Sequence, residues 1–301
     1  MRMVAVMDMP TSPLVRTWAQ RLHADDGVEL AINQFGEPAA PPLVFAHGFG
    51  QTRQAWTETA IRLAGDGWHC ITADARGHGE SGWREDGAYA FAQFIDDLVQ
   101  VARIPNEKPI LVGASMGGLL GIRAQAEHAP FRALVLVDIT PRWEAAGVER
   151  ILSFMRAHPQ GFASVDEAAD AIANYLPHRA EKKPPERLRA LLVPTANGRL
   201  RWHWDPRLIE RIGASGANEQ AALLGAARAI DVPCLLISGE HSDIVSAATI
   251  EEFRHCVPHA QHVRVSRATH MVAGDANDAF TQAVRQFITP LRTGSGTRSC
   301  T

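Results

Sequence analysis

The chain has 301 residues, of which 46% are hydrophobic and 21% are charged, values close to the averages of soluble globular proteins. This length suits one large domain with an insertion, and the composition allows a sizeable buried core. Because the formal net charge is only −3 and the lysines and arginines are scattered, neither nucleic acid nor an anionic membrane surface is expected as the main partner.

Targeting and metal-binding signals are weak in this sequence. Residues 1–15 make a poor signal peptide, because Asp8 and two prolines interrupt their apolar stretch. No run approaches the roughly 18 apolar residues of a transmembrane helix. Four cysteines lie far apart without a CxxC pair: Cys70, Cys234, Cys256 and Cys300. This spacing is typical of free thiols in a reducing compartment. We therefore expect a cytoplasmic protein without a membrane span, metal site or cofactor.

Strands and helices alternate along the first 140 residues. The pattern around Asp26-Gly27 predicts a β-hairpin over 20–35. Further apolar runs predict strands at 42–47, 68–74, 109–114 and 132–138. Apolar residues at helical spacing predict helices at 52–64, 90–104 and 116–128. Apolar strands separated by helices indicate an α/β fold with a parallel sheet covered on both faces.

The alternation stops after Asp138 and resumes near residue 230. Segment 141–229 has helical stretches, a proline-rich break and the aromatic cluster RWHWDP, but no convincing core strand. Beyond it the pattern predicts strands at 232–239 and 261–266 and helices at 246–257 and 275–288. One α/β domain is therefore predicted to be split by a helical insertion. The two parts of the α/β domain are predicted at 20–140 and 230–291, with the insertion at 141–229 between them. Terminal extensions are predicted at 1–19 and 292–301.

A candidate nucleophile lies in the pentapeptide 113–117, which matches G-x-S-x-G with Ser115 at its centre. A predicted strand runs directly into the motif and a predicted helix runs directly out. So tight a strand-to-helix turn strains the central residue and requires small side chains two positions before and after it. The turn holds the serine hydroxyl at the carboxyl end of the sheet, where amides of the next helix can stabilise an oxyanion.

A serine nucleophile needs an imidazole that takes its proton. Of the 13 histidines, His270 is the best placed, because it follows the last predicted strand and precedes the last helix. Its position after the serine also fits the Ser…Asp…His order of such enzymes. His47, His78 and His241 are weaker candidates, since each adjoins a turn that can require a polar residue for structural reasons.

The imidazole in turn needs a carboxylate on its other nitrogen, which fixes its tautomer. Asp138 ends the strand that follows the nucleophile helix, and Asp243 follows the predicted strand at 232–239. Both aspartates can reach the carboxyl edge of the sheet, so the residues alone leave the choice open.

Six short motifs carry a family resemblance. They are HGFG (47–50), DARGHGES (74–81), GASMGG (113–118), VDITP (137–141), SGEHSDIVS (238–246) and ATHMV (268–272). Over about residues 25–290 the sequence resembles the capped α/β-hydrolase superfamily of esterases, lactonases, C–C bond hydrolases and cofactor-free peroxidases. The resemblance implies a mostly parallel eight-stranded sheet with helices on both faces. It also implies that 141–229 is a helical cap inserted after strand 6.

The resemblance also assigns roles to individual residues. It implies that the backbone amides of Phe49 and Met116 form the oxyanion hole, and that Asp74 is structural. In many relatives the acid lies three positions after a glycine. Counted from Gly239, that offset gives Ser242 in this chain. Some relatives that lack an acid at this position carry it after strand 6 instead. Asp138 is therefore the favoured acid, with Asp243 as the alternative.

The expected function is hydrolysis of an ester, thioester or lactone of a small, largely apolar substrate through an acyl-enzyme on Ser115. Trp143, Trp202 and Trp204 are candidates to line the substrate pocket. A C–C bond hydrolase or a cofactor-free perhydrolase would use the same triad, and a non-catalytic receptor would keep only the fold. The expected partner is a small molecule, and the chain is expected to be a monomer or homodimer.

Overall fold

A computed structural model describes residues 15–176, 188–214, 216–275 and 277–293. Its centre is an eight-stranded sheet with the order β1-β2-β4-β3-β5-β6-β9-β10. The strands are β1 (Thr17–His23), β2 (Glu29–Phe35), β3 (Pro42–Ala46), β4 (His69–Ala73), β5 (Ile110–Ala114), β6 (Ala133–Val137), β9 (Cys234–Gly239) and β10 (Gln261–Val265).

Strand β2 runs against its neighbours, and the rest of the sheet is parallel. It pairs antiparallel with β1 and β4, whereas each neighbouring pair from β4 to β10 is parallel. The turn between β1 and β2 uses Gly27 at φ +85°, a conformation that glycine adopts without strain. Both the predicted hairpin and the predicted mostly parallel eight-stranded sheet are confirmed.

The central strands bury side chains on both faces. In β3, Leu43 and Phe45 point into one apolar cluster while Val44 points into the other, and all three are fully buried. In β5, Val112 and Leu111 divide between the same two clusters. Because successive side chains of a strand point to opposite faces, a near-continuous apolar run means that both faces are covered.

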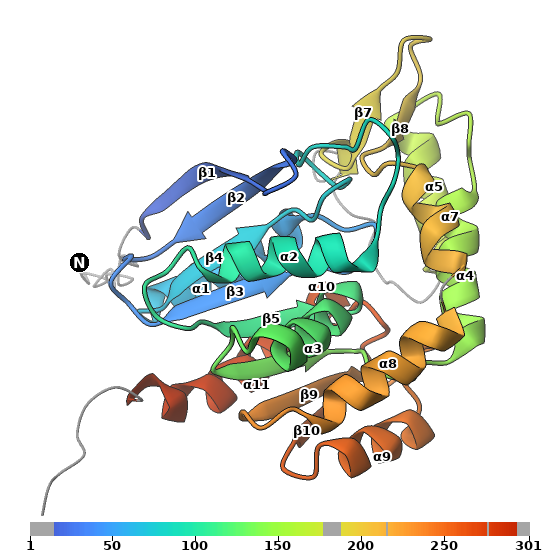
Figure 1. The fold of residues 1–301 in the computed structure, drawn as a ribbon. Coiled ribbons are helices and arrows are strands. Elements are labelled where there is room, and N and C mark those ends of the chain that lie inside the picture. Colours follow the sequence, from blue (N-terminus) through green and yellow to red (C-terminus); the bar gives the residue numbers. More distant parts are fainter. Residues whose placement is uncertain (1–14, 177–187, 215, 276, 294–301) are drawn as a thin grey trace, which may run out of the picture.

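Helices cover both faces of the sheet (Figure 1). They are α1 (Thr57–Gly65), α2 (Phe91–Ala102), α3 (Met116–His128), α8 (Gly216–Arg228), α9 (Ala247–Cys256), α10 (Val272–Asp275) and α11 (Asn277–Ile288), with short 3-10 turns η1 (Arg53–Trp56) and η2 (Thr289–Thr293). The helices α2, α3, α8 and α9 pack on one face, and α1 and α11 pack on the other.

The segment between β6 and β9 combines helices with a small hairpin. Its other elements are α4 (Ala145–Arg156), α5 (Val165–Tyr175), β7 (Leu192–Pro194), β8 (Leu200–Trp202) and α7 (Arg207–Ala214). The strands β7 and β8 form an antiparallel sheet of their own, separate from the central one. The predicted insertion at 141–229 also ends in α8, which packs against α3 and α9 and so lies with the helices of the core.

This segment lies over loops at the carboxyl end of the central strands. The N–H of Asp205 donates to the carbonyl of Gly77, in the loop after β4, at 2.8 Å. The N–H of Glu144 donates to the carbonyl of Ile244, in the loop after β9, at 3.0 Å. The tyrosine hydroxyl of Tyr89 also donates to Asp205 at 2.7 Å. These bonds place the segment above the edge where the candidate nucleophile emerges.

The sheet begins earlier than the sequence indicates. Residues 17–19, which the sequence assigns to an N-terminal extension, form the first part of β1. Residues 1–14 and 294–301, which make up most of the two predicted extensions, lie outside the described residues. None of the described helices combines the length and apolar character needed to cross a bilayer.

Candidate active site

Ser115 occupies the turn between β5 and α3 in a strained backbone conformation. Its φ is +48° and its ψ is −117°, a combination that L-residues rarely adopt. The N–H of Ser115 donates to the carbonyl of Val137 at 3.0 Å, which anchors the turn to the neighbouring strand β6. Strain of this kind persists only where the surrounding structure enforces it, and it clusters at functional sites.

The glycines that flank Ser115 are required by contact. A Cβ on Gly117 would overlap the backbone carbonyl of Ala46 in β3, with the carbonyl carbon at 2.6 Å. A Cβ on Gly113 would lie 2.6 Å from the carbonyl oxygen of Gly117. The two glycines therefore allow β3, β5 and the start of α3 to approach closely enough to form the turn.

Asp138 emerges from β6, the strand next to the one that carries Ser115. The register pairs Ala114 with Val137, so Ser115 and Asp138 leave the sheet side by side. Like Ser115, Asp138 has a positive φ, of +48°. Its side chain is completely buried, and its Oδ1 accepts a 2.7 Å hydrogen bond from the N–H of Gly239 at the end of β9.

His270 contacts the other oxygen of this carboxylate. Its Nδ1 lies 2.8 Å from Asp138 Oδ2, and the histidine side chain is 13% exposed. A buried carboxylate that accepts from Nδ1–H leaves Nε2 as the basic nitrogen of the neutral ring. The arrangement therefore gives one imidazole a fixed tautomer at the edge of the sheet that carries Ser115.

Asp243, the alternative acid, has a different partner. Its Oδ2 accepts a 2.9 Å bond from Nη1 of Arg150, a residue of α4, and the pair is partly exposed. The sequence could not separate the two aspartates, because both follow strands at the same edge. The structure brings Asp138 and not Asp243 into hydrogen-bond contact with His270.

The loop after β3 lies directly against Ser115. A Cβ on Gly48 would meet Ser115 Cβ at 3.2 Å. Gln51 then links this loop to the loop that carries His270: its Oε1 accepts from the N–H of Gly48 at 3.2 Å, and its Nε2 donates to Sδ of Met271 at 3.1 Å. These two hydrogen bonds join the loop after β3, which lies beside Ser115, to the loop that carries His270.

The same loop places a backbone amide near Ser115. Phe49 follows Gly48, and its ring packs edge-on against His78 with the ring centres 5.4 Å apart. Met116 is the first residue of α3, so its N–H has no acceptor within the helix. The Met116 amide therefore lies next to Ser115 at the positive end of the α3 dipole.

Three buried histidines support these loops. The rings of His47 and His78 lie 5.2 Å apart, and those of His78 and His203 lie 6.2 Å apart. Burial is the main cause that lowers the pKa of each of these histidines: the pKa of His47 is lowered, that of His78 is lowered strongly, and that of His203 falls to about 3. All three are therefore neutral near pH 7. His47 bonds Gly48 through Nδ1 and Ala75 through Nε2.

Neither His47 nor His78 shares the geometry of His270. Both nitrogens of His47 are used by backbone groups, and Nδ1 of His78 lies 3.0 Å from the carbonyl of Arg76. His241 is exposed. Among the described residues no three His, Cys, Asp or Glu side chains gather as ligands for a metal ion.

Asp74 holds the loop before the turn at 77–79. Its buried carboxylate accepts from the N–H of Arg53 at 2.6 Å and from the N–H of Glu80 at 2.9 Å, and it forms an ion pair with the Arg53 guanidinium. These bonds use the carboxylate within the loop and agree with a structural role.

The family model described as the alpha/beta hydrolase fold matches residues 41–276. The chain belongs to the α/β-hydrolase family. It is 30% identical over 259 residues to a 3-hydroxybutyrate-oligomer hydrolase of Cupriavidus necator, covering 80% of this chain and 86% of that protein. It is also 29% identical over 256 residues to an esterase of Mycobacterium tuberculosis, covering 82% of each.

A solved structure agrees with this assignment. The crystal structure of an E-2-(acetamidomethylene)succinate hydrolase superposes with a TM-score of 0.77 at 25% identity, over 91% of this chain and 99% of that one. The relatives of this chain include proteins named as hydrolases, esterases and lipases. The chain is an α/β-fold hydrolase.

An aromatic cluster of this α/β hydrolase lies above the loop after β3. Trp204 approaches Gly50, where an added Cβ would lie 3.5 Å from its ring. Trp202 stacks on Trp204 with ring centres 5.2 Å apart, and both tryptophans are buried. Trp143 is half-buried, and the ring contacts among the described residues do not include it. Of the three candidates for the pocket wall, Trp204 is the one placed against the serine's surroundings.

Several groups at this site could not be predicted from the sequence. The amide of Gly239, the side chain of Gln51 and the hydroxyl of Ser242 all contact the loops or side chains described above. Only Ser242 left a signal, as the residue found at the offset where many relatives carry the acid. His203, within the RWHWDP cluster, bonds the N–H of Gly79 through Nδ1 at 2.8 Å.

Proposed function

We propose that this α/β hydrolase is a serine carboxylic-ester hydrolase with Ser115 as nucleophile, His270 as general base and Asp138 as the acid of the triad. The observation that carries the proposal is the 2.8 Å contact between His270 Nδ1 and the buried Asp138 carboxylate. It lies beside the strained turn of Ser115, on the adjacent strand.

Acyl transfer follows from this arrangement. The Ser115 hydroxyl attacks the ester carbonyl carbon while His270 Nε2 takes its proton. The N–H groups of Phe49 and Met116 hold the oxyanion, and the imidazolium protonates the departing alcohol. Water then attacks the acyl-enzyme in the same way and releases the acid and free Ser115. Asp138 keeps its negative charge throughout and stabilises the imidazolium.

The surroundings of Ser115 favour a small and largely apolar substrate. A Cβ added at Gly50 would lie 3.0 Å from Met155 and 3.5 Å from Trp204. Both of these side chains come from the segment 141–229. We infer that this segment is the cap, and that its apolar residues form the wall opposite Ser115. Esters, thioesters and lactones all present the required carbonyl, and the relatives named above include a 3-hydroxybutyrate-oligomer hydrolase and an esterase.

Covalent labelling tests the proposal. The wild type should be modified by a fluorophosphonate probe and should hydrolyse p-nitrophenyl esters or lactones at neutral pH, because an activated serine attacks both. Ser115→Ala should lose labelling and turnover while keeping its thermal unfolding midpoint. A wild type that binds ester analogues but neither reacts with the probe nor turns over would favour a non-catalytic receptor and contradict the proposal.

A further inference from the structure

Ser242 hydrogen-bonds the carboxylate that contacts His270. It lies in the loop between β9 and α9, and its Oγ is 2.6 Å from Asp138 Oδ2. This is the same oxygen that His270 Nδ1 contacts at 2.8 Å. A hydrogen bond to an ionised oxygen is shorter and stronger than one between neutral groups.

The surroundings of Ser242 fix the direction of this hydrogen bond. Its Oγ accepts from the N–H of Val245 at 3.0 Å and from the N–H of Ile244 at 3.3 Å. A hydroxyl has two lone pairs and one proton, and these two amides use the lone pairs. The proton is therefore left to donate to Asp138, which as a carboxylate can only accept.

Asp138 is consequently surrounded by three donors. The N–H of Gly239 holds Oδ1, and the Ser242 hydroxyl shares Oδ2 with His270. The first two donors stop the carboxylate from rotating about its own bond, and all three spread its charge.

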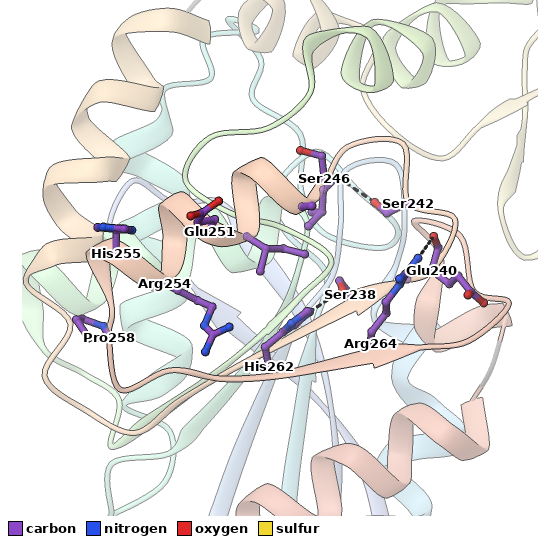
Figure 2. Close-up of a pocket in the computed structure, with 14 residues that line it drawn as sticks. Ser238, Glu240, Ser242, Ser246, Glu251, Arg254, His255, Pro258, His262 and Arg264 are labelled. Carbon is purple, nitrogen blue, oxygen red and sulfur yellow. Dashed lines mark hydrogen bonds between the residues drawn. The ribbon is translucent and has the colours of Figure 1, made fainter.

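Ser242 also contributes to the wall of a cavity beside the loop after β9. A cavity of about 920 Å³ lies between α9 and β10, and Ser242 is part of its wall. Figure 2 shows Ser242 on the loop after β9, next to Ser246. Asp138 itself is completely buried, although the serine that bonds it lines the cavity.

The geometry points to Ser242 as a positioning residue of the proposed esterase. Its hydroxyl orients Asp138 Oδ2 toward His270 and reduces the negative charge that the Asp138 carboxylate presents to the imidazole. This inference rests on the proposed function and adds to the triad a residue that does not touch the substrate.

Other charged groups near the pair are already bonded. Asp243 is paired with Arg150 of α4 at 2.9 Å, and Asp275 of α10 accepts from the N–H of Thr269 at 3.0 Å. Neither contact involves the Ser242 side chain. Removing the Ser242 hydroxyl therefore leaves these two contacts in place, while Asp138 loses a donor and the N–H groups of Ile244 and Val245 lose an acceptor.

Substitution of Ser242 tests the inference through kinetics and pH dependence. Ser242→Ala should lower kcat by about ten- to a hundredfold, the range for losing a hydrogen bond to a charged group, with little change in KM. Because one donor fewer leaves more negative charge facing Nδ1, the protonated imidazole is stabilised. The acid limb of kcat/KM should therefore move to higher pH. Ser242→Thr keeps the hydroxyl and should restore both values.

A matched control is available in the same loop. Ser246 also lines the cavity, but its Oγ accepts from the N–H of Thr249 and caps α9 instead of contacting Asp138. Ser246→Ala should reduce the thermal unfolding midpoint without moving the acid limb. If Ser242→Ala does not fold, Ser242→Cys keeps the size with a weaker donor and should shift the limb in the same direction.

Rates should be expressed per fluorophosphonate-reactive site, so that unfolded protein does not count. A Ser242→Ala enzyme with the wild-type kcat and an unmoved acid limb would overturn the inference, as would a Ser242→Thr enzyme as impaired as the alanine variant. In either case a labelled, active wild type would leave the proposed function intact. An unlabelled wild type would instead mean that the proposed function fails.

Discussion

At the scale of single residues, the site depends on two non-glycine residues held in left-handed backbone geometry. Ser115 and Asp138 both have φ of +48°, and each is anchored by its own N–H to the next strand of the sheet, at Val137 and Ile237. The strain is offset by the parallel hydrogen bonding around them. As a result the hydroxyl and the carboxylate emerge at fixed positions on adjacent strands.

Replacing each candidate acid tests which carboxylate acts on His270. Asp138→Asn should lower kcat by about ten-thousandfold, because an amide no longer selects the productive tautomer or stabilises the imidazolium. Asp243→Asn loses only a partly exposed ion pair with Arg150 and should change kcat less than about threefold. The measurement is steady-state ester hydrolysis by both variants. A larger loss in the Asp243 variant would reverse the assignment.

The sequence identifies Ser115 and His270 more readily than it identifies the acid. A glycine-flanked serine between a strand and a helix leaves a local pattern, and so does a histidine after the last strand. The choice between Asp138 and Asp243 depends on which loop folds toward His270, and that is set by the Arg150 contact and the bonds from Gly239 and Ser242. These are contacts between distant segments, which a single sequence does not record.

At the scale of elements, the close approach of β3, β5 and α3 fixes the position of Ser115 above the sheet. Gly117→Ala should lower the free energy of unfolding by about 3 kcal/mol, because its Cβ would overlap the backbone of Ala46. The control is Gly225→Ala in α8, where no atom lies within 4 Å of an added Cβ and a gain of about 0.5 kcal/mol is expected. Denaturant unfolding measures both. Equal effects would show that the close approach does not constrain the turn.

The elements of the sheet could be predicted well, and those of the inserted segment less well. Continuous apolar runs such as 132–138 have few alternatives to buried strands, and β6 is found there. The short strands β7 and β8 have no such pattern, because three-residue strands are held by their pairing and by the bridge between Phe162 and Leu200. Likewise, the packing of α8 on α3 depends on tertiary contacts that periodicity does not reveal.

At the scale of the whole molecule, buried neutral histidines connect stability to pH. Burial, followed by the neighbouring His47, lowers the pKa of His203 from 6.5 to about 3. The unfolded chain therefore binds a proton that the folded protein does not, between those two values. The stabilisation is fully present above about pH 6.5 and is lost as the pH falls toward 3.

From pH 7 to pH 5, His203 alone should lower the free energy of unfolding by about 2 kcal/mol. His203→Asn offers an oxygen to the N–H of Gly79 but does not titrate, so it should remove that part of the pH dependence. His255→Gln, at an exposed position of α9, serves as the control and should leave the slope unchanged. Urea unfolding at the two pH values gives the comparison. A slope equal to the wild type in the His203 variant would refute this account.

The assignment of Ser115 is tested most directly by the mass of the enzyme trapped during turnover of p-nitrophenyl acetate. If Ser115 is the nucleophile, rapid acid quenching should give a species heavier by one acetyl group, and peptide mapping should place that group on Ser115. The burst of p-nitrophenol should match the amount of acylated enzyme. An enzyme that turns over the ester with no acylation, or with the acetyl group on another residue, would show that Ser115 is not the nucleophile.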